Sequence, residues 1–499
     1  MRAGVLVLFS VLAGCSYNRG SPESGGSSIT LGPAPEQEEE EVERLDRTVP
    51  PDVGPPASMR IPEAAEFDLS NGLRVVMVEK HDVPMVNVVL QVRGGAAAVP
   101  EGKAGLAALT ASLLDEGAGE RSSLEIAEAI ETLGARISSS AGRDAAVVRL
   151  GVVRPRFEEA LEIFADVVTA PTFPDADVER VRTVQLTRIL QGQSEPRVIA
   201  DEALSRVLFG DGHPYGPPVM GSKDSVEQLT KEDVVAFYDA GYHTGNATLV
   251  VTGDVTREDL EPLLEEAFGA WASGAAPEVP AVEAPSLNQT TIYIVDKPDA
   301  AQSEVRVGRV AVDRATDDYF ALTVLNTILG GSFTSRLNMK LREEKALTYG
   351  ARSAFAMRRQ PGPFVAGAAV HTPATDSAVV EFLNEIGRMA VEAVPDEELE
   401  RAKNYVALRL PQGFETASDL AGRVSDLVLY DLPMDYYGGY VDQILETSAE
   451  DVLRAAQAWL TGGLAIVVAG DRGVIQAPLE ALGIGPVVVL QPRDPSSAE

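Results

Sequence analysis

The sequence has few of the residues on which several classes of enzyme depend. Its 499 residues include one cysteine and four histidines. A single cysteine excludes an internal disulfide and leaves no cysteine-rich metal site. The histidines are His81, His213, His243 and His371, and no two of them have the i, i+4 spacing that would place them on one helix face. We interpret all four as structural or exposed residues rather than metal ligands.

Basic residues are also scarce. The chain has 42 Lys and Arg against 75 Asp and Glu, a formal net charge of −33. Such a surface repels nucleic-acid phosphates and anionic lipid headgroups, so neither is favoured as a partner. The charge fits a soluble, secreted or periplasmic surface, or one that attracts basic peptides. The length is sufficient for two or three domains with substantial cores.

The N-terminus has an apolar run that is too short to span a membrane. Arg2 precedes Val5–Leu12, and Leu12-Ala13-Gly14-Cys15 follows. This pattern is typical of a secretory signal, and a small-residue cleavage site ending in cysteine resembles a bacterial lipobox. We therefore predict that Cys15 becomes the lipidated first residue; the alternative is an ordinary signal peptide with a chance cysteine. Ser16 is not an inner-membrane retention signal of the Asp type, so the expected location is the bacterial cell envelope, at the outer membrane facing the periplasm.

The composition divides the chain into segments. Residues 16–60 are rich in Ser, Gly, Pro and Glu and lack the apolar residues that offset the entropy of ordering, so we predict a disordered tether. A Pro/Ala-rich stretch, GAAPEVPAVEAP, begins at Gly274 and is the best domain boundary. The predicted organisation is a signal peptide (1–15), the tether (16–60), a first domain (61–273), a linker (274–288), a second domain (289–490) and a tail (491–499).

The folded part mixes strand and helix patterns. Runs at 73–78 and 86–92 flank a turn at 81–84, so they are predicted to be paired strands. Further strands are expected at 143–153, 247–251, 291–295 and 304–312. Helical spacing predicts helices at 123–133, 156–168, 176–191, 231–240 and 319–329.

Two segments recur at nearly one offset. Lys231-Glu232-Asp233-Val234 is echoed by Ala449-Glu450-Asp451-Val452, and the strand end TLVVTGD at 248–254 is echoed by AIVVAGD at 465–471. Two independent echoes indicate an internal duplication. The predicted fold class is α+β: two homologous domains, each a mixed β-sheet with helices packed on it, forming a clamshell around a chamber.

The stretch from Gly102 to Gly119, GKAGLAALTASLLDEGAG, predicts a short amphipathic helix after an extended strand. Positions separated by three and four residues share one helix face, which here carries Ala108, Ala111 and Ser112. The frame resembles the metal-binding helix of the insulinase/pitrilysin family of metallopeptidases. In that family the face carries the inverted zincin motif H-x-x-E-H, two zinc-ligating histidines and a glutamate base.

The resemblance extends over residues 61–490, but the metal centre is missing from it. Ala108 and Ser112 stand at the two histidine positions, and Ala111 stands at the glutamate position. Counting back eight residues from Pro196 places Arg188 at the third ligand position. A methyl group cannot ligate zinc and a cation would repel it, so no metal or cofactor is expected in this chain.

The second domain keeps a different family signature. GGSFTSRL at 330–337 leads into LREEKALTY at 341–349, similar to the family's G-G-x-x-S-R-L and R-E-x-x-x-L-x-Y segments. The glycine pair lacks a following GK[ST], so we interpret it as a turn opening a helix rather than a phosphate loop. The resemblance gives Arg342 and Tyr349 the role of reaching the scissile peptide, where a guanidinium and a phenol suit an oxyanion. The alternative is that Arg342 pairs with Glu343 or Glu344 and that Tyr349 is a core aromatic.

A chain with the Arg/Tyr pair and no zinc motif resembles the non-catalytic subunit of two-subunit family members. The resemblance implies a zinc-bearing relative as partner, with zinc in that partner, and a peptide that adds a strand at an edge including Ser139, Ser140 and Ala141. The first hypothesis is thus a lipid-anchored partner subunit of a zinc endopeptidase. The second is a catalytically inert envelope scaffold or peptide-binding protein. A third, a peptidase active by itself, lacks ligands.

Overall fold

The computed structural model describes Gly54 and residues 62–491. The predicted signal peptide, Cys15, the tether other than Gly54, and the tail from residue 492 lie outside the described residues. All elements below belong to one compact unit. In the described part of the chain, no helix combines the length and apolar character needed to cross a membrane.

The first half is built on a six-stranded mixed sheet. Its order is β1-β2-β8-β3-β7-β6, with β2 and β8 parallel and the other pairs antiparallel. The strands are β1 (Ala65–Asp68), β2 (Arg74–Glu79), β3 (Met85–Arg93), β6 (Arg136–Ala141), β7 (Ala145–Val153) and β8 (Ala247–Gly253). A separate short hairpin pairs β4 (Gly117–Ala118) with β5 (Arg121–Ser122).

One predicted strand pairing is wrong. The runs at 73–78 and 86–92 form β2 and β3, but β8 lies between them and pairs with both. The reason is that every residue of β8 is buried, so this strand needs neighbours on both sides and layers on both faces. The local turn signal at 81–84 therefore connects two strands without pairing them.

The predicted helices of the first half match the observed ranges within one or two residues, and three further helices, α5, α6 and α8, were not predicted. Ser122 caps α2 in a capping box, in which its hydroxyl accepts from the backbone N–H of Glu125. The helices are α1 (Leu106–Leu113), α2 (Ser123–Thr132), α3 (Phe157–Thr169), α4 (Asp175–Gly192), α5 (Pro196–Phe209), α6 (Lys223–Glu227), α7 (Lys231–Gly241) and α8 (Arg257–Phe268).

The second half repeats the sheet of the first. Its order is β11-β12-β10-β13-β9-β14, with β9 parallel to both β13 and β14 and the other pairs antiparallel. The strands are β9 (Thr291–Asp296), β10 (Gln302–Val310), β11 (Arg352–Phe355), β12 (Pro363–His371), β13 (Ala465–Gly470) and β14 (Val487–Leu490). One sequence echo falls on β8 and β13, which hold equivalent central places, and the other falls at the starts of two helices, Lys231–Gly241 and Ala449–Trp459, so the predicted duplication and α+β class are confirmed.

The helices of the second half follow the same order. They are α9 (Tyr319–Asn326), α10 (Arg336–Asn338), α11 (Thr375–Val391), α12 (Asp396–Arg409), α13 (Ala417–Leu429), α14 (Tyr440–Glu446), α15 (Ala449–Trp459) and α16 (Arg472–Ala481). A π-helical turn, Thr327–Gly331, continues α9. The glycine pair 330–331 thus ends this helix instead of opening the next one, which begins at Arg336. No helix or strand lies between Phe268 and Thr291, the region of the predicted linker.

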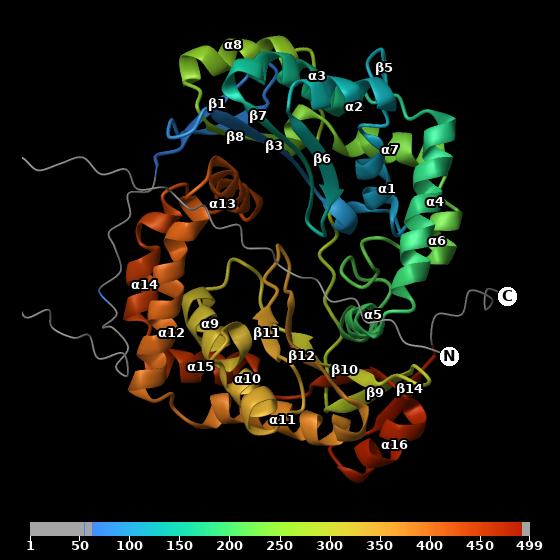
Figure 1. Ribbon diagram of the computed structural model, residues 1–499, viewed down its shortest axis with the longest axis vertical. Helices are drawn as coiled ribbons and strands as arrows, with labels where there is room; N and C mark the ends of the chain where they lie inside the picture. The colour runs from blue at the N-terminus through green and yellow to red at the C-terminus, as the bar shows by residue number, and fades with distance from the viewer. Residues whose placement is uncertain (1–53, 55–61, 492–499) are drawn as a thin grey trace, which may run out of the picture. The chain divides into compact units, whose positions relative to one another are not determined.

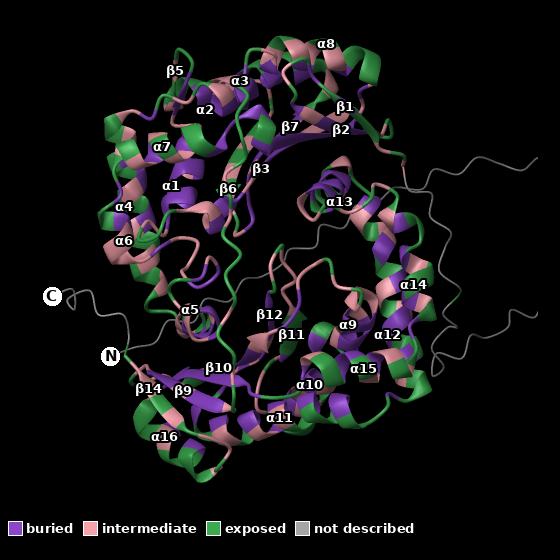
Figure 2. Cartoon of the chain, turned by 180° about the vertical axis from the view of Figure 1, so that it is seen from behind, coloured by how far each residue is buried: buried purple, intermediate pink, exposed green. Residues whose placement is uncertain are grey.

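The two halves exchange a helix. Helix α5, from the first half, packs on β10 and β13 of the second sheet, while α13, from the second half, packs on β3 and β8 of the first (Figure 1). Thr252 on β8 donates its hydroxyl to the carbonyl of Ala417 at the start of α13, at 2.6 Å. The covered strands are largely buried in both sheets (Figure 2). Each sheet therefore has helices of its own half on one face and a helix from the other half on the opposite face.

Candidate functional site

Helix α1 is held tightly at its first turn. Gly105 precedes it with φ +95°, a left-handed conformation that favours glycine. A Cβ at this position would lie 2.8 Å from the carbonyl oxygen of Met220. The buried amide of Gln185 on α4 donates to the carbonyls of Gly105 at 3.1 Å and Met220 at 2.8 Å. These contacts fix the orientation of the helix that carries the predicted degenerate metal site.

The face of α1 that would bind a metal is lined by small side chains. Ala108 and Ala111 are 7% and 1% exposed, and Ser112 is half-buried. Arg188 is exposed on α4, which packs against α1. Among the described residues, no group of three His, Cys, Asp or Glu side chains lies close enough together to hold a metal ion. This face therefore presents small side chains, and it lacks a set of side chains that would ligate a metal ion.

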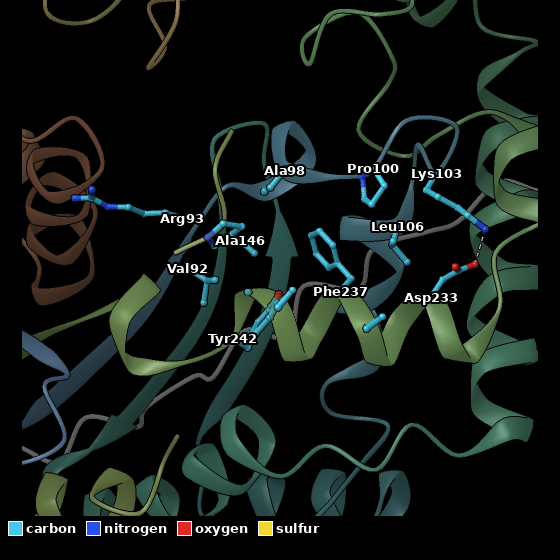
Figure 3. A pocket seen from close by; sticks show the side chains of 15 residues that line it. Val92, Arg93, Ala98, Pro100, Lys103, Leu106, Ala146, Asp233, Phe237 and Tyr242 are labelled. Atoms are coloured by element: carbon cyan, nitrogen blue, oxygen red, sulfur yellow. Dashed lines mark hydrogen bonds and ion pairs between the residues drawn. The ribbon is translucent and has the colours of Figure 1, made fainter. Parts of the chain in front are cut away.

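An apolar cavity of about 250 Å³ lies beside the same helix (Figure 3). Leu106 of α1 and Phe237 of α7 line it. Lys103 and Asp233 close one end with an ion pair of 2.8 Å, and Arg93 stands at the other end. Asp233 also caps α7 by accepting from the backbone N–H of Thr230. The carboxylate that Asp233 contributes to the cavity is therefore already held by Lys103 and by the backbone of Thr230. The cavity can accommodate an apolar group, but it supplies no free carboxylate for acid–base catalysis.

The four histidines are dispersed. His213 and His243 are buried, and His81 and His371 are exposed. His213 Nδ1 accepts from the backbone N–H of Tyr215, and burial lowers the pKa of this imidazole. The Nδ1 of His81 lies 2.7 Å from Asp254, a carboxylate that raises its pKa. Each histidine thus occupies its own local environment, as the sequence interpretation expects.

The Arg342–Tyr349 segment presents both predicted side chains outward. Tyr349 is 91% exposed, so the alternative of a core aromatic is wrong. The Arg342 guanidinium lies 4.6 Å from the ring centroid of Phe333, itself 63% exposed. It also pairs with Glu343 at 3.4 Å, as the alternative proposes, but this exposed ion pair is weak and leaves the ring contact intact.

The backbone between Arg342 and Tyr349 holds an unusual conformation. Ala346 has φ +50°, in the left-handed region that a residue with a Cβ rarely adopts. Its N–H donates to the carbonyl of Arg342 at 3.2 Å, and Leu347 then donates to Leu341 at 2.8 Å. Thr348 donates its hydroxyl to Ala369 on β12. These hydrogen bonds fix the chain on both sides of Ala346 and hold its strained backbone conformation in place. That conformation sets the position of Tyr349.

The strand that was predicted to receive a peptide lies at an edge of the first sheet. Strand β6 lies at the open end of the first sheet, and alternate residues along it are exposed. Ser140 and Ala141 lie on this strand, next to Ser139, whose hydroxyl is buried and has no partner among the described residues. Figure 1 places β6 and α1 in the half of the unit opposite to α10, from which the Arg342 segment continues. The degenerate helix and the Arg/Tyr pair are therefore not brought together within this chain.

Comparison with known proteins decides the family. The profile described as Insulinase (Peptidase family M16) matches residues 74–222, and that described as Peptidase M16 inactive domain matches residues 228–406. The chain belongs to peptidase family M16. The second M16 profile covers the Arg342–Tyr349 segment, and the first covers α1 and β6.

Among M16 relatives, an uncharacterised zinc protease of Mycobacterium leprae is 27% identical over 410 residues, which is 81% of this chain and 90% of that protein. The non-peptidase homolog YmxG of Helicobacter pylori is 24% identical, covering 76% of this chain and 87% of the relative. The crystal structure of an M16 inactive domain from Pseudomonas fluorescens has a TM-score of 0.77 and 28% identity, covering 82% and 98% of the two chains. A Helicobacter pylori protease with 20% identity and a TM-score of 0.77 shares the fold.

One cavity was missed by the sequence reasoning. It lies where the end of β6 meets α13, and it contains Arg143 and Arg358, which are far apart in sequence. The Arg143-Asp144 pair at a strand start was a weak signal, because adjacent opposite charges are common on surfaces. The loop between β11 and β12 brings the two arginines together, because the backbone N–H of Arg359 donates to Asp144 at 3.2 Å.

Proposed function

We propose that this M16 chain is the non-catalytic subunit of a two-subunit zinc endopeptidase, to which it contributes Arg342 and Tyr349 in trans. The observation that carries the proposal is the exposure of Tyr349, beside the half-buried Arg342, on a conformationally fixed segment, in a chain whose equivalent of the metal-binding face has Ala108, Ala111 and Ser112. The zinc, its activated water and the carboxylate base would come from an M16 relative that carries H-x-x-E-H.

The chemistry assigned to the pair is electrostatic. Peptide hydrolysis passes through a tetrahedral intermediate whose oxygen carries negative charge, and donors placed at that oxygen lower the barrier. A guanidinium remains protonated at neutral pH, and a phenol donates one hydrogen bond. The Phe333 ring limits the directions open to Arg342, which reduces the entropy lost when the guanidinium meets substrate.

The relatives support this division of labour without naming a partner. One relative is described as a non-peptidase homolog and one solved structure as an M16 inactive domain. A lipid anchor at Cys15 in the outer membrane, facing the periplasm, belongs to the same proposal on the strength of the N-terminal sequence alone.

The test combines the purified chain with a zinc-bearing M16 relative from the same organism and measures cleavage of a quenched-fluorescence peptide library. The chain alone should cleave nothing, and the mixture should exceed the relative alone. The Arg342→Ala/Tyr349→Phe variant should lower kcat about 100-fold or more, the usual loss for an oxyanion donor. Association, followed by size-exclusion chromatography, should be unchanged.

Tyr405 and Arg409 provide a matched control. They form another exposed Arg/Tyr pair in the second half, with the guanidinium 5.1 Å from the ring centroid. The Tyr405→Phe/Arg409→Ala variant should support full activity. If the Arg342/Tyr349 variant supports activity as well as the wild-type chain, the assisting role is refuted and the scaffold hypothesis takes its place.

A further inference from the structure

A polar cavity of about 790 Å³ lies between the two halves, at the C-terminal end of β6. Gln91 on β3 and Arg149 on β7 contribute to its first-half wall. Arg358 and residues of α13, including Ser425, form the opposite wall. The exchanged helix therefore builds this cavity, and neither half contains it alone.

Three buried polar atoms that line this cavity have no hydrogen-bond partner among the described residues. They are Gln91 Oε1, Ser425 Oγ and Arg358 Nη1. Gln91 is 3% exposed and Ser425 is 8% exposed, so water reaches neither side chain freely. Buried polar groups are nearly always paired, because an unpaired one costs the free energy of its lost hydration. Three such atoms around one cavity indicate a site shaped for a polar ligand.

The cavity also concentrates positive charge in a strongly acidic protein. Burial, together with the neighbouring Arg358, lowers the pKa of Arg143 to about 10. Burial also lowers the pKa of Arg358, whose guanidinium lies 4.8 Å from the ring centroid of Tyr215. Arg149 is exposed at the same cavity. Two buried guanidinium groups at one cavity gain from an anion placed between them, because the anion offsets the cost of burying their charge.

The acidic side chains at the cavity do not fully neutralise these guanidinium groups. Asp144 accepts from the Tyr215 hydroxyl at 2.5 Å and from the backbone N–H of Arg359 at 3.2 Å. Asp419 accepts from Thr416 at the start of α13. Burial raises the pKa of Asp426, which favours its neutral form. Arg358 Nη1 remains without a partner among the described residues despite these neighbours.

The position of the cavity indicates what kind of anion fits. Ser140 and Ala141 of the edge strand line it, so an extended peptide paired with β6 would run directly into it. The unpaired atoms include an acceptor on Gln91 as well as a donor on Arg358. A peptide offers both an N–H and a carboxylate, whereas an inorganic anion without protons satisfies only the donor.

We infer that this cavity binds a carboxylate of an extended peptide that pairs with β6. The carboxylate belongs either to the peptide's C-terminus or to an Asp or Glu side chain, since both present the same planar group to a guanidinium. The inference rests on the proposed function only in taking a peptide as the ligand.

Fluorescence anisotropy with the purified full-length chain, in detergent and without a partner, tests it. Three fluorescein-labelled hexapeptide pools serve as probes. The first lacks Asp and Glu and has a free C-terminus, the second is the same pool amidated, and the third is amidated with one fixed Glu. We expect the first or third pool to bind at least tenfold more tightly than the second, and the pool that does so identifies the source of the carboxylate.

Arg358→Gln should remove this preference, and Arg149→Gln should reduce it severalfold; because Arg149 is exposed, its variant tests the site even if Arg358→Gln fails to fold. Arg401→Gln makes the same charge change on α12, away from the cavity, where the side chain pairs with Glu397 at 3.6 Å, and should retain the preference. Equal binding of all pools, no binding of any pool, or an intact preference in Arg149→Gln overturns the inference. None of these results depends on partner activation, so failure of the proposed function is a separate outcome.

Discussion

Replacing Leu204 with alanine removes a side chain that the first half of the chain places against the second sheet. Leu204 lies on α5 and is 4% exposed. Its Cδ2 would lie 3.2 Å from a Cβ built on Gly308 of β10, and it shares a buried cluster with Val467 and Ala469 of β13. If α5 couples the halves, this one truncation should destabilise both.

The magnitude follows from the burial. Truncating a fully packed leucine to alanine costs about 2.7–5 kcal/mol, the larger part of the range applying where the surroundings cannot collapse. Strands β10 and β13 are central in their sheet and cannot move readily, so we expect a loss of about 3 kcal/mol or more. With a denaturant slope of about 3 kcal/mol/M in urea, the unfolding midpoint falls by about 1 M.

The chain provides its own probes for the assay. It has two tryptophans, one in each half, Trp271 and Trp459. Urea unfolding followed in Trp459→Phe and Trp271→Phe backgrounds therefore reports each half separately. Leu204→Ala should lower both midpoints, with the Trp459 signal falling at least as far as the Trp271 signal. Leu190→Ala on α4 is the control, because Leu190 is 49% exposed and should shift neither midpoint by more than about 0.3 M.

A shift confined to Trp271 would refute the reasoning. It would mean that α5 is stabilised by its own half, and that its contacts with β10 and β13 contribute little free energy. If only the Trp459 transition shifts, the packing of α5 on the second sheet is supported, but the inferred coupling between the halves is refuted.

Two further predictions concern His81 and Cys15. The pKa of His81 is raised by Asp254 and Glu79, so the pairing stabilises the fold below the ordinary histidine pKa and this stabilisation is lost as pH rises through the raised value. His81→Gln should therefore lower Tm more at pH 5.5 than at pH 8.5, and equal losses at both would exclude the pairing. Cys15→Ser should abolish labelling by an alkyne fatty acid and release the chain from the membrane fraction, whereas labelled Cys15→Ser protein would exclude lipidation at that residue.

The sequence was sufficient for the features that are local or repeated. Apolar spacing located α1 between Gly105 and Gly117. The duplication was visible because β8 and β13 are buried on both faces, which favours similar runs of small and apolar residues in the two strands.

The features that depend on distant contacts were not predictable in the same way. A turn at 81–84 suggests a hairpin, and nothing near it indicates that a strand 165 residues further on separates β2 from β3. Helix α5 has the same difficulty: its small residues Ala200 and Ala203 fit closely on a sheet, but the pattern does not say which sheet. The exchange of α5 and α13 is a property of the packed unit.

The same distinction applies to the sites. Arg342 and Tyr349 were found because they belong to a contiguous motif, and the exposure of Tyr349 then decided against a core role. The carboxylate site was missed because Gln91, Arg358 and Ser425 come from three distant segments. A buried residue without a partner has no signature in sequence, since the same residue types are usually satisfied or exposed.

Two energetically unfavourable features of this chain bear on the choice between an assisting subunit and a scaffold. A scaffold needs stability and surface, and neither requires Ala346 in the left-handed region or unpaired polar atoms at a cavity. Both features oppose folding, by about 1–3 kcal/mol for a strained backbone position and by a similar amount for each unsatisfied buried group. They lie at the two places where a peptide would be handled, the Arg/Tyr segment and the end of the β6 edge. Similar costs occur elsewhere among the described residues, for example at Phe173, with φ +45°, and at the unpaired hydroxyl of Tyr242. A chain that holds substrate is therefore favoured only by where the strained and unpaired groups lie, beside the Arg342–Tyr349 motif and the β6 edge, and the peptide-binding and activation experiments decide between the two roles.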